Sequence, residues 1–301
     1  MLSEDEVAIY DRQIRLWGSQ AQKKLMNSEL LILGLSPIHF EFIKNIVLAG
    51  IKASIWDNIN TRSCDLACNF LLEEEDIGKR RMVCIDKFKE MNPLTKIYTA
   101  DQNETNAELF CESCLNKTNY TGIVVSLDEE VNMLNAKNIS KKFQSKDIFI
   151  SFSVSIGTRI FLFFNNNTIN FDEALEFNID KLKQILHSVK NLHPYILIII
   201  CMLRERYQKA VKNESHSSEI GEILREIRTT PSIEIEKALE LEKLFNETWG
   251  KTISPIASIG GGLLCQEVTK FCIHGFGEYF CCIFDMEQCE AVTATVKMCH
   301  A

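Results

Sequence analysis

The first half of the chain alternates short apolar runs with stretches of helical periodicity. Residues 30–35 form a continuous apolar run, which is typical of a strand buried on both faces. The next stretch repeats apolar residues every three to four positions and ends near Gly50, as a helix would. Further elements are expected as strands at 53–57, 96–100, 122–127 and 147–154 and as a helix at 82–91. This order predicts an α/β fold with a doubly wound, mostly parallel sheet.

The N-terminus carries a helix signal. Ser3 and Glu6 have the spacing of a capping box. The apolar residues that follow predict one continuous helical stripe, made of Val7, Tyr10, Ile14 and Trp17. Arg12 and Arg15 lie off this stripe, so we expect them to point outward, and Gly18 is expected to end the helix.

The pattern changes after residue 158. The elements expected there are strands at 159–164 and 168–171 around a polar turn, helices at 233–244 and 255–271, and a strand at 279–284. The chain is therefore expected to leave a sheet domain, build a helical insertion and return. The domain limits are 1–165 with 251–301 for the sheet domain and 166–250 for the insertion.

Composition narrows the class of protein. Of 301 residues, 46% are hydrophobic and 25% charged, as in ordinary folded proteins. The net charge of −8 argues against a nucleic-acid partner, because no basic stripe is available to replace phosphate counterions. The N-terminus is acidic where a targeting signal would be basic, and the longest apolar run, 195–203, is too short to cross a bilayer. We therefore expect the twelve cysteines to be reduced thiols in the nucleus and cytoplasm.

The turn after the first strand is where α/β proteins commonly hold phosphate. It begins with Gly34, but Ser36 and Pro37 stand where a glycine-rich loop would expose its backbone, and Pro37 lacks an N–H. Asp57, at the end of the second strand, has the position of a ribose-binding acid. The residues leave nucleotide binding open and favour a purely structural turn.

Several segments resemble a known family. Residues 10–18, Tyr-Asp-Arg-Gln-Ile-Arg-Leu-Trp-Gly, resemble the opening of the ThiF-type activating enzymes for ubiquitin-like proteins, and in particular the non-catalytic half of their heterodimers. The resemblance continues in order and spacing through 21–25, 45–50, 56–57, 77–81, 259–262 and 266–268. It implies a Rossmann-like adenylation fold in a heterodimer whose partner subunit binds ATP and Mg and adenylates the modifier.

The sequence departs from the catalytic halves of that family at their functional positions. The resemblance places Cys68 where those halves have a phosphate-clamping arginine, Arg81 where they have a lysine, and Asp128 nearest their metal-binding aspartate. A thiol does not neutralise a polyphosphate as a guanidinium does. Gly34, Asp57, Arg81 and Asp128 are thus degenerate remnants, and we expect no intact nucleotide site and no metal on this chain. A self-sufficient homodimeric adenylating enzyme would need the missing groups.

The resemblance gives one residue a catalytic role. It implies that Arg12 crosses the dimer interface and reaches the ATP phosphates in the partner's active site. An arginine supplied in trans stabilises the charge that develops during attack on ATP. A surface salt bridge is the alternative for Arg12.

The resemblance also points to a modifier. Both the sumoylation and the neddylation enzymes are split into two chains, and the insertion 166–250 is short for the neddylation branch. Residues 171–176 resemble the segment before the insertion of the sumoylation branch. The expected partners are therefore the large catalytic subunit and SUMO. The neddylation branch, and a scaffold pseudoenzyme with no part in the chemistry, are the alternatives.

The cysteines suggest no further site. Cys201 is the only cysteine of the insertion and lies in an apolar run, so we expect it to pack rather than to act as a nucleophile. Cys111 and Cys114 have zinc spacing, but a second pair is missing, so no structural zinc is expected. The acidic run 73–76 is expected to be a solvated loop.

Overall fold

The computed structural model describes most of the sheet regions and less of the insertion. The described residues are 2–99, 119–129, 148–164, 189–190, 199, 202–203, 235–276, 279–287 and 289–296. The chain divides into two compact units. Unit 1 comprises Met1–Ser126, Asp147–Ile150 and Ile253–Gly277, and unit 2 comprises Leu127–Lys146, Ser151–Thr252 and Glu278–Ala301.

Unit 1 is built on four parallel strands. They are β1 (Glu29–Leu33), β2 (Lys52–Trp56), β3 (Ile97–Thr99) and β4 (Gly122–Ser126). β1 lies between β2 and β4, with Leu30 opposite both Ala53 and Gly122, and β3 pairs with β2. The side chains of 30–33 are fully buried, as the continuous apolar run predicts.

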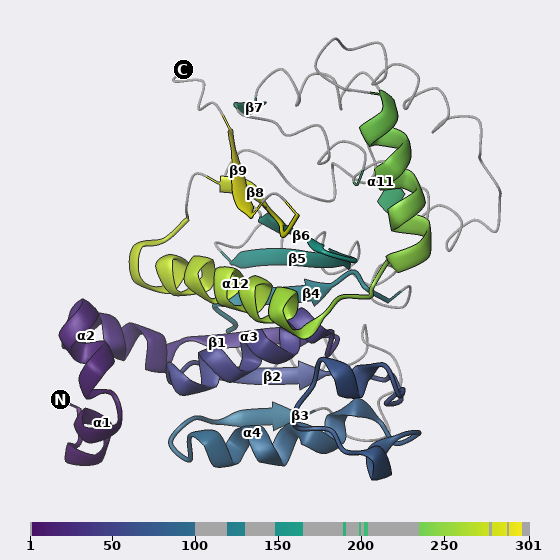
Figure 1. Cartoon of the computed structure of the whole chain (residues 1–301). Helices are drawn as coiled ribbons and strands as arrows, with labels where there is room; N and C mark the ends of the chain where they lie inside the picture. Colours follow the sequence, from purple (N-terminus) through teal and green to yellow (C-terminus); the bar gives the residue numbers. More distant parts are fainter. Residues whose placement is uncertain are drawn as a thin grey trace. The chain divides into compact units, whose positions relative to one another are not determined.

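Three helices accompany this sheet (Figure 1). They are α3 (Pro37–Leu48), α4 (Ile85–Met91) and α12 (Ser254–His274), with a short 3-10 turn, η3 (Arg81–Cys84), leading into α4. α12 packs along α3. The contact is close because Gly261 of α12 has no side chain: a Cβ there would lie 2.7 Å from the Cβ of Glu41.

Residues 4–27 form an N-terminal arm of two helices, α1 (Glu4–Ile9) and α2 (Asp11–Asn27). The prediction of one continuous stripe is wrong, because the helix breaks at Tyr10. The Tyr10 side chain is buried, whereas Val7 is exposed. At Gly18 the backbone leaves the helical region, with φ +85° and ψ 160°, a region open almost only to glycine, so α2 consists of two helical pieces joined by a kink, and the expected helix end at Gly18 is confirmed.

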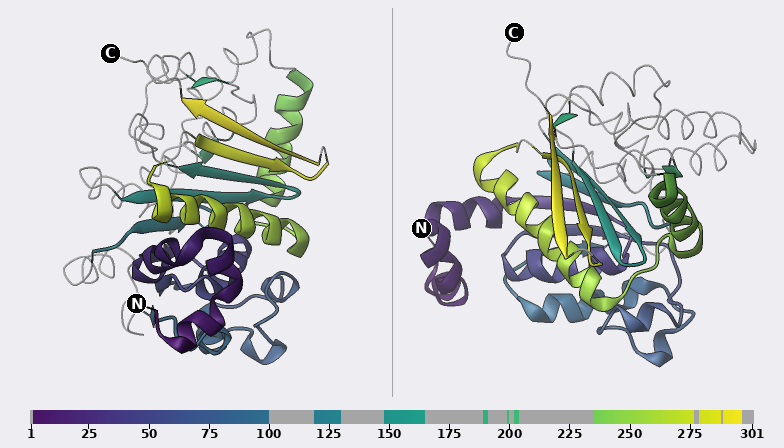
Figure 2. Two further views of the ribbon diagram at one scale, coloured as in Figure 1. Left: turned by 90° about the vertical axis from the view of Figure 1, so that its left-hand side faces the viewer. Right: turned by 45° about the horizontal axis from the view of Figure 1, so that its top comes forward.

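Unit 2 carries antiparallel strands. They are β5 (Phe149–Ile156, whose first two residues belong to unit 1), β6 (Arg159–Phe164), β7 (Val189–Lys190), β8 (Tyr279–Asp285) and β9 (Glu290–Val296). β6 lies between β5 and β8, and β9 lies between β8 and β7. Figure 2 shows β8 and β9 side by side. Unit 2 also contains α11 (Ile235–Thr248).

Apart from the N-terminal stripe, the expected strands and helices within the described residues are confirmed, with shifts of a few residues at their ends. β7 and β9 were not expected, and β7 is a strand inside the stretch expected to be a helical insertion. The strand predicted at 168–171 lies outside the described residues, and both edges of β6 are already paired. The insertion predicted at 166–250 is described only in part and stays a prediction. Among the described helices, none is long and apolar enough to cross a membrane.

Candidate functional site

The turn after β1 is closed by its own backbone and side chains. Gly34 has φ +85°, and its N–H donates to the carbonyl of Trp56 at 2.9 Å. Ser36 caps α3 by accepting the N–H of His39 at 3.4 Å, and Pro37 begins the helix without an N–H. His39 in turn donates from Nδ1 to the Gly34 carbonyl at 2.7 Å. These bonds use up donors that a phosphate would need at the helix N-terminus.

Asp57 is turned into this loop. Its Oδ2 accepts the Leu35 N–H at 2.5 Å, and its Oδ1 accepts the Ile59 N–H at 2.8 Å. The carboxylate is buried. Asp57 thus fastens the turn after β1 to the chain that leaves β2, which is a structural use of the acid.

The side chain of Arg81 forms an ion pair with the same carboxylate of Asp57. Its Nη2 donates to Oδ2 of Asp57 at 2.7 Å, and its Nη1 lies 3.8 Å from Oδ1 of Asp65. The guanidinium is buried. Cys68 is buried nearby on the same segment, and burial, with the charges of Asp65 and Cys64, raises the pKa of its thiol. The single positive charge of Arg81 therefore lies between two carboxylates of this chain, of which Asp65 is also paired with Arg62.

His39 carries no charge at neutral pH. Complete burial lowers its pKa to about 4, the bond to the Gly34 carbonyl opposes this shift, and the charge of Arg81 adds to it. The buried turn therefore presents a neutral imidazole and a paired arginine, and neither is a free cation for a phosphate.

Asp128 belongs to unit 2, whereas Gly34, Asp57 and Arg81 belong to unit 1. Its Oδ1 accepts the N–H of Ser155 at 2.8 Å, and its Oδ2 accepts the Ser155 hydroxyl at 3.1 Å. The Asp128 backbone also lies close to Gly250, where a Cβ would be 2.5 Å from the Asp128 carbonyl oxygen. The residue binds the end of β5 within its own unit.

Arg12 and Arg15 both lie exposed on α2, as predicted. Arg15 forms an ion pair with Asp11, with Nη2 3.0 Å from Oδ2. Arg12 has no ion pair or side-chain hydrogen bond within the part of the chain that the structure describes. Among these residues the surface salt bridge is formed by Arg15 and not by Arg12.

The face of α2 that carries Gln13 and Gln22, here called the inner face of the arm, binds the C-terminal end of α3 and so holds the helix that carries Arg12. Gln13 Nε2 donates to the Leu48 carbonyl at 3.0 Å, and Gln22 Nε2 donates to the Ala49 carbonyl at 2.9 Å. Helix C-termini leave such carbonyls without partners in the helix itself.

Tyr10 adds a third anchor to this face. Its hydroxyl accepts a hydrogen bond from Asn92 Nδ2 at 2.9 Å. Gly50 leaves room for the ring, since a Cβ there would lie 2.7 Å from the Tyr10 hydroxyl. Sequence reasoning missed Gln13, Gln22 and Asn92, because isolated amides carry no periodic signal.

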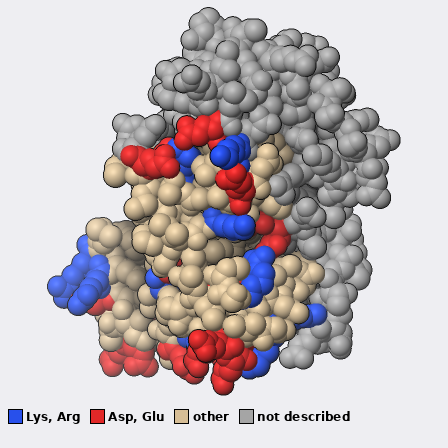
Figure 3. Space-filling view, turned by 45° about the vertical axis from the view of Figure 1, so that its right-hand side comes forward, with Lys and Arg blue, Asp and Glu red and all other residues tan. Residues whose placement is uncertain are grey.

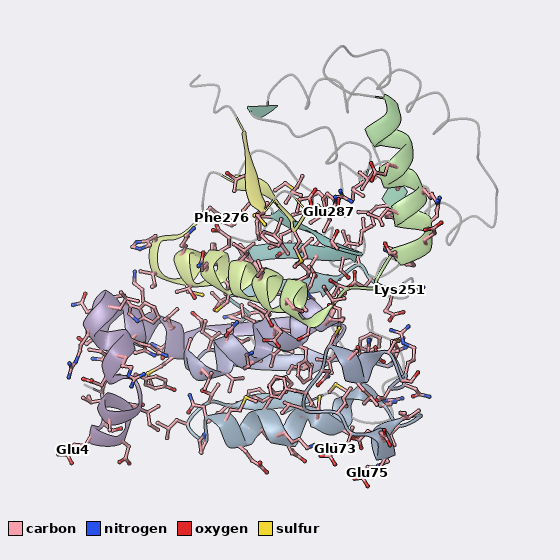
Figure 4. All side chains as sticks on the ribbon, in the orientation of Figure 1. Glu4, Glu73, Glu75, Lys251, Phe276 and Glu287 are labelled. Carbon is pink, nitrogen blue, oxygen red and sulfur yellow. The ribbon has the colours of Figure 1, made fainter. Side chains whose placement is uncertain are left out.

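Other predicted features are less informative. Among the described residues no group of His, Cys, Asp or Glu has the arrangement of a metal site. Cys111, Cys114 and Cys201 lie outside those residues. Glu73, Glu74 and Glu75 are exposed, as expected, but Asp76 is buried and Glu74–Asp76 form a 3-10 turn, so the prediction of a solvated loop is wrong for Asp76. Figure 3 shows acidic side chains along this lower edge of unit 1, where Figure 4 labels Glu73 and Glu75.

The parallel strands, the turn after β1 and the acid after β2 define a Rossmann-like α/β protein. The model of the ThiF family matches residues 10–282, so the chain belongs to the ThiF family. The match begins at Tyr10 and therefore includes the segment with Arg12.

Curated relatives extend over most of the chain. It is 28% identical to SUMO-activating enzyme subunit 1 of Dictyostelium discoideum, over 89% of this chain and 86% of the relative. It is 24% identical to the Homo sapiens protein of the same name, over 89% and 88% of the two chains. It is also 42% identical to the DNA damage tolerance protein rad31 of Schizosaccharomyces pombe, over 33% of each chain.

Solved structures support the fold. The chain is similar to PaaA with a TM-score of 0.59 at 15% identity, over 97% of this chain and 84% of PaaA. It is similar to Escherichia coli MccB with a TM-score of 0.59 at 13% identity, over 98% of this chain and 73% of MccB. At these identities the likeness concerns the fold alone.

Proposed function

We propose that this chain is the non-catalytic subunit of a heterodimeric SUMO-activating enzyme. In this proposal the large catalytic subunit binds ATP and Mg, adenylates SUMO and passes it to its own cysteine. This chain supplies Arg12 in trans to the partner's ATP site and is inactive alone. The complex works in the nucleus and cytoplasm.

The observation that carries the proposal is the extent of the match to the curated relatives. Likeness to SUMO-activating enzyme subunit 1 covers 89% of this chain and 86% of the Dictyostelium discoideum relative, so it involves both units and not one shared motif. The membership of the ThiF family agrees with an adenylation-type fold.

The turn after β1 supports placing ATP on the partner. A nucleotide would need free N–H donors, a ribose acid and a cation at this turn. Here Asp57 accepts the Leu35 N–H, Arg81 is paired with Asp57, and Ser36 takes a donor of α3. These residues do not fit ATP, and no step of the reaction is assigned to them.

Arg12 supports a role in chemistry rather than in assembly alone. In adenylation the C-terminal carboxylate of SUMO attacks the α-phosphorus of ATP, and pyrophosphate leaves. Negative charge builds up on the phosphate oxygens, and a guanidinium held near them stabilises that charge. Arg12 is exposed and without an ion pair among the described residues, while the inner face of its helix is fixed to α3. Its cationic side chain is thus available for a site outside this chain.

ATP–pyrophosphate exchange tests the proposal. We would measure exchange for the chain alone, for the large catalytic subunit of the same organism alone, and for both together with SUMO. The proposal predicts exchange only when both chains and SUMO are present. Exchange by this chain alone would contradict it, and exchange with the neddylation modifier in place of SUMO would assign the chain to that branch.

A further inference from the structure

The outer face of the arm carries an exposed leucine beside Arg12. Leu16 is 77% exposed, more than any other large hydrophobic side chain among the described residues. It lies four residues after Arg12 on α2, so the two side chains are neighbours on one helix face. In Figure 3 basic side chains stand out at the left, where the arm lies.

The first helix of the arm adds to this unpartnered surface. α1 is held as a helix by its capping box, in which the Ser3 N–H donates to Glu6 at 2.7 Å and the Glu6 N–H donates to Ser3 at 3.1 Å. None of its residues is buried, and Val7 and Ile9 are both exposed. A short helix gains little stability on its own and is normally supported by packing. The arm thus presents apolar area that unit 1 leaves uncovered.

We infer that Leu16 is the anchor by which the arm docks on the catalytic subunit and positions Arg12 at its ATP. This inference rests on the proposed function. The occupant is the partner subunit that the likeness to SUMO-activating enzyme subunit 1 implies. The face that it would cover joins a cation without an ion pair among the described residues to an apolar side chain one helical turn away. Its complement is an anionic group bordered by an apolar socket, as a bound polyphosphate in a protein cleft provides.

Such an anchor determines where the guanidinium can reach. An arginine side chain is long and flexible, and a fixed contact one turn away restricts the region its head group samples. An exposed apolar side chain that becomes fully buried in an interface contributes free energy in proportion to the apolar area removed from water. Leu16 is therefore assigned to assembly and positioning, while Arg12 is assigned to charge stabilisation.

The experiment separates these two roles. We would measure the Kd for the catalytic subunit by calorimetry, together with pyrophosphate exchange, for wild type, Leu16→Asp, Leu16→Ala and Arg12→Ala. Leu94, on the loop after α4 and 42% exposed, provides the matched control Leu94→Asp. Circular dichroism and thermal unfolding check that each variant is folded, as exposed positions should allow.

The inference predicts that Leu16→Asp weakens binding at least about tenfold and Leu16→Ala does so less, while Arg12→Ala and Leu94→Asp bind like wild type. At saturating catalytic subunit, Leu16→Ala should still exchange pyrophosphate more slowly than wild type, because Arg12 is less well held. Wild-type affinity in folded Leu16→Asp would overturn the inference and leave the proposed function intact. If wild type itself does not bind the catalytic subunit, both fail.

Discussion

The guanidinium of Arg81 lies 2.7 Å from the carboxylate of Asp57, with the two side chains 2% and 0% exposed. The ion pair stands where an α/β protein of this kind would hold a nucleotide, and it satisfies both charges within the chain. Arg12, in contrast, is exposed and has no ion pair in the described regions. The two arginines thus have different roles: Arg81 stabilises the fold of this chain, whereas Arg12 is proposed to act at the ATP site of the partner subunit.

Removing Arg81 should destabilise the protein strongly. Arg81→Ala leaves the buried carboxylate of Asp57 without its partner, and we expect a loss of about 3–5 kcal/mol in the free energy of unfolding. Arg15→Ala removes an exposed ion pair with Asp11 and should cost under about 0.5 kcal/mol. Urea denaturation at pH 7.5 measures both. Equal midpoints for the two variants would show that the buried pair does not hold the turn.

His39 should make stability depend on pH. Its pKa is about 4 when folded and 6.5 when exposed, so between these values the unfolded chain binds a proton that the folded chain does not. The neutral, buried His39 therefore does not lower the free energy of unfolding above about pH 6.5. As the pH falls below this value the free energy of unfolding decreases, by about 2 kcal/mol at pH 5. His39→Asn retains a donor for the Gly34 carbonyl but has no such proton.

The check is the free energy of unfolding of wild type minus that of His39→Asn, measured at pH 7.5 and at pH 5. The difference should fall by about 2 kcal/mol on acidification. A difference that does not change with pH would mean that His39 is not buried in its neutral form.

Two adjacent glycines of α12 should respond in opposite ways. A Cβ at Gly261 would lie 2.7 Å from the Cβ of Glu41 and from the backbone nitrogen of Phe42, so Gly261→Ala forces α12 away from α3 and should cost about 1–3 kcal/mol. At Gly262 no described atom outside the helix's own nearby backbone lies within 4 Å of such a Cβ. Gly262→Ala should therefore gain up to about 1 kcal/mol, because alanine favours a helix interior.

Thermal unfolding of the two alanine variants under one buffer decides this prediction. A lower Tm for Gly261→Ala with an unchanged or higher Tm for Gly262→Ala is expected. If Gly261→Ala is as stable as wild type, the two helices do not approach as closely as described.

The sequence predicts the strands and long helices well, because their signal is local. The apolar run at 30–33 and the periodicity of 255–271 each specify an element without reference to the rest of the chain. The break at Tyr10 escaped prediction, since it depends on a pocket that Gly50 provides forty residues later. β9 escaped because its seven residues do not form a continuous apolar run, and its pairing with β8 places it in the sheet.

The site shows the same limit. Spacing placed Gly34 and Asp57 at the ends of adjacent parallel strands, and the structure brings them together through the Leu35 N–H. The motif did not predict that the Arg81 side chain is buried against Asp57, because an aligned position gives the type of residue but not the orientation of its side chain. The pairing follows from two buried carboxylates, Asp57 and Asp65, which need a cation.

Arg12 carries the central claim about activity. Arg12→Ala should leave the heterodimer assembled, because the arm is held in place without Arg12, by Gln13 on the Leu48 carbonyl of α3 and by Tyr10 on Asn92 after α4. Adenylation should fall at least about tenfold, which corresponds to about 1.4 kcal/mol of lost transition-state stabilisation. Arg12→Lys should rescue only part of the rate, since an ammonium does not reproduce the planar guanidinium. Arg15→Ala is the matched control and should have little effect, because Arg15 is already paired with Asp11.

The most direct test is pyrophosphate exchange by wild-type and Arg12→Ala heterodimers at saturating SUMO and ATP, with dimer content measured in each sample. The account predicts equal dimer content and an exchange rate at least about tenfold lower for Arg12→Ala. Equal rates at equal dimer content would contradict it and would leave this chain a scaffold without a part in the chemistry.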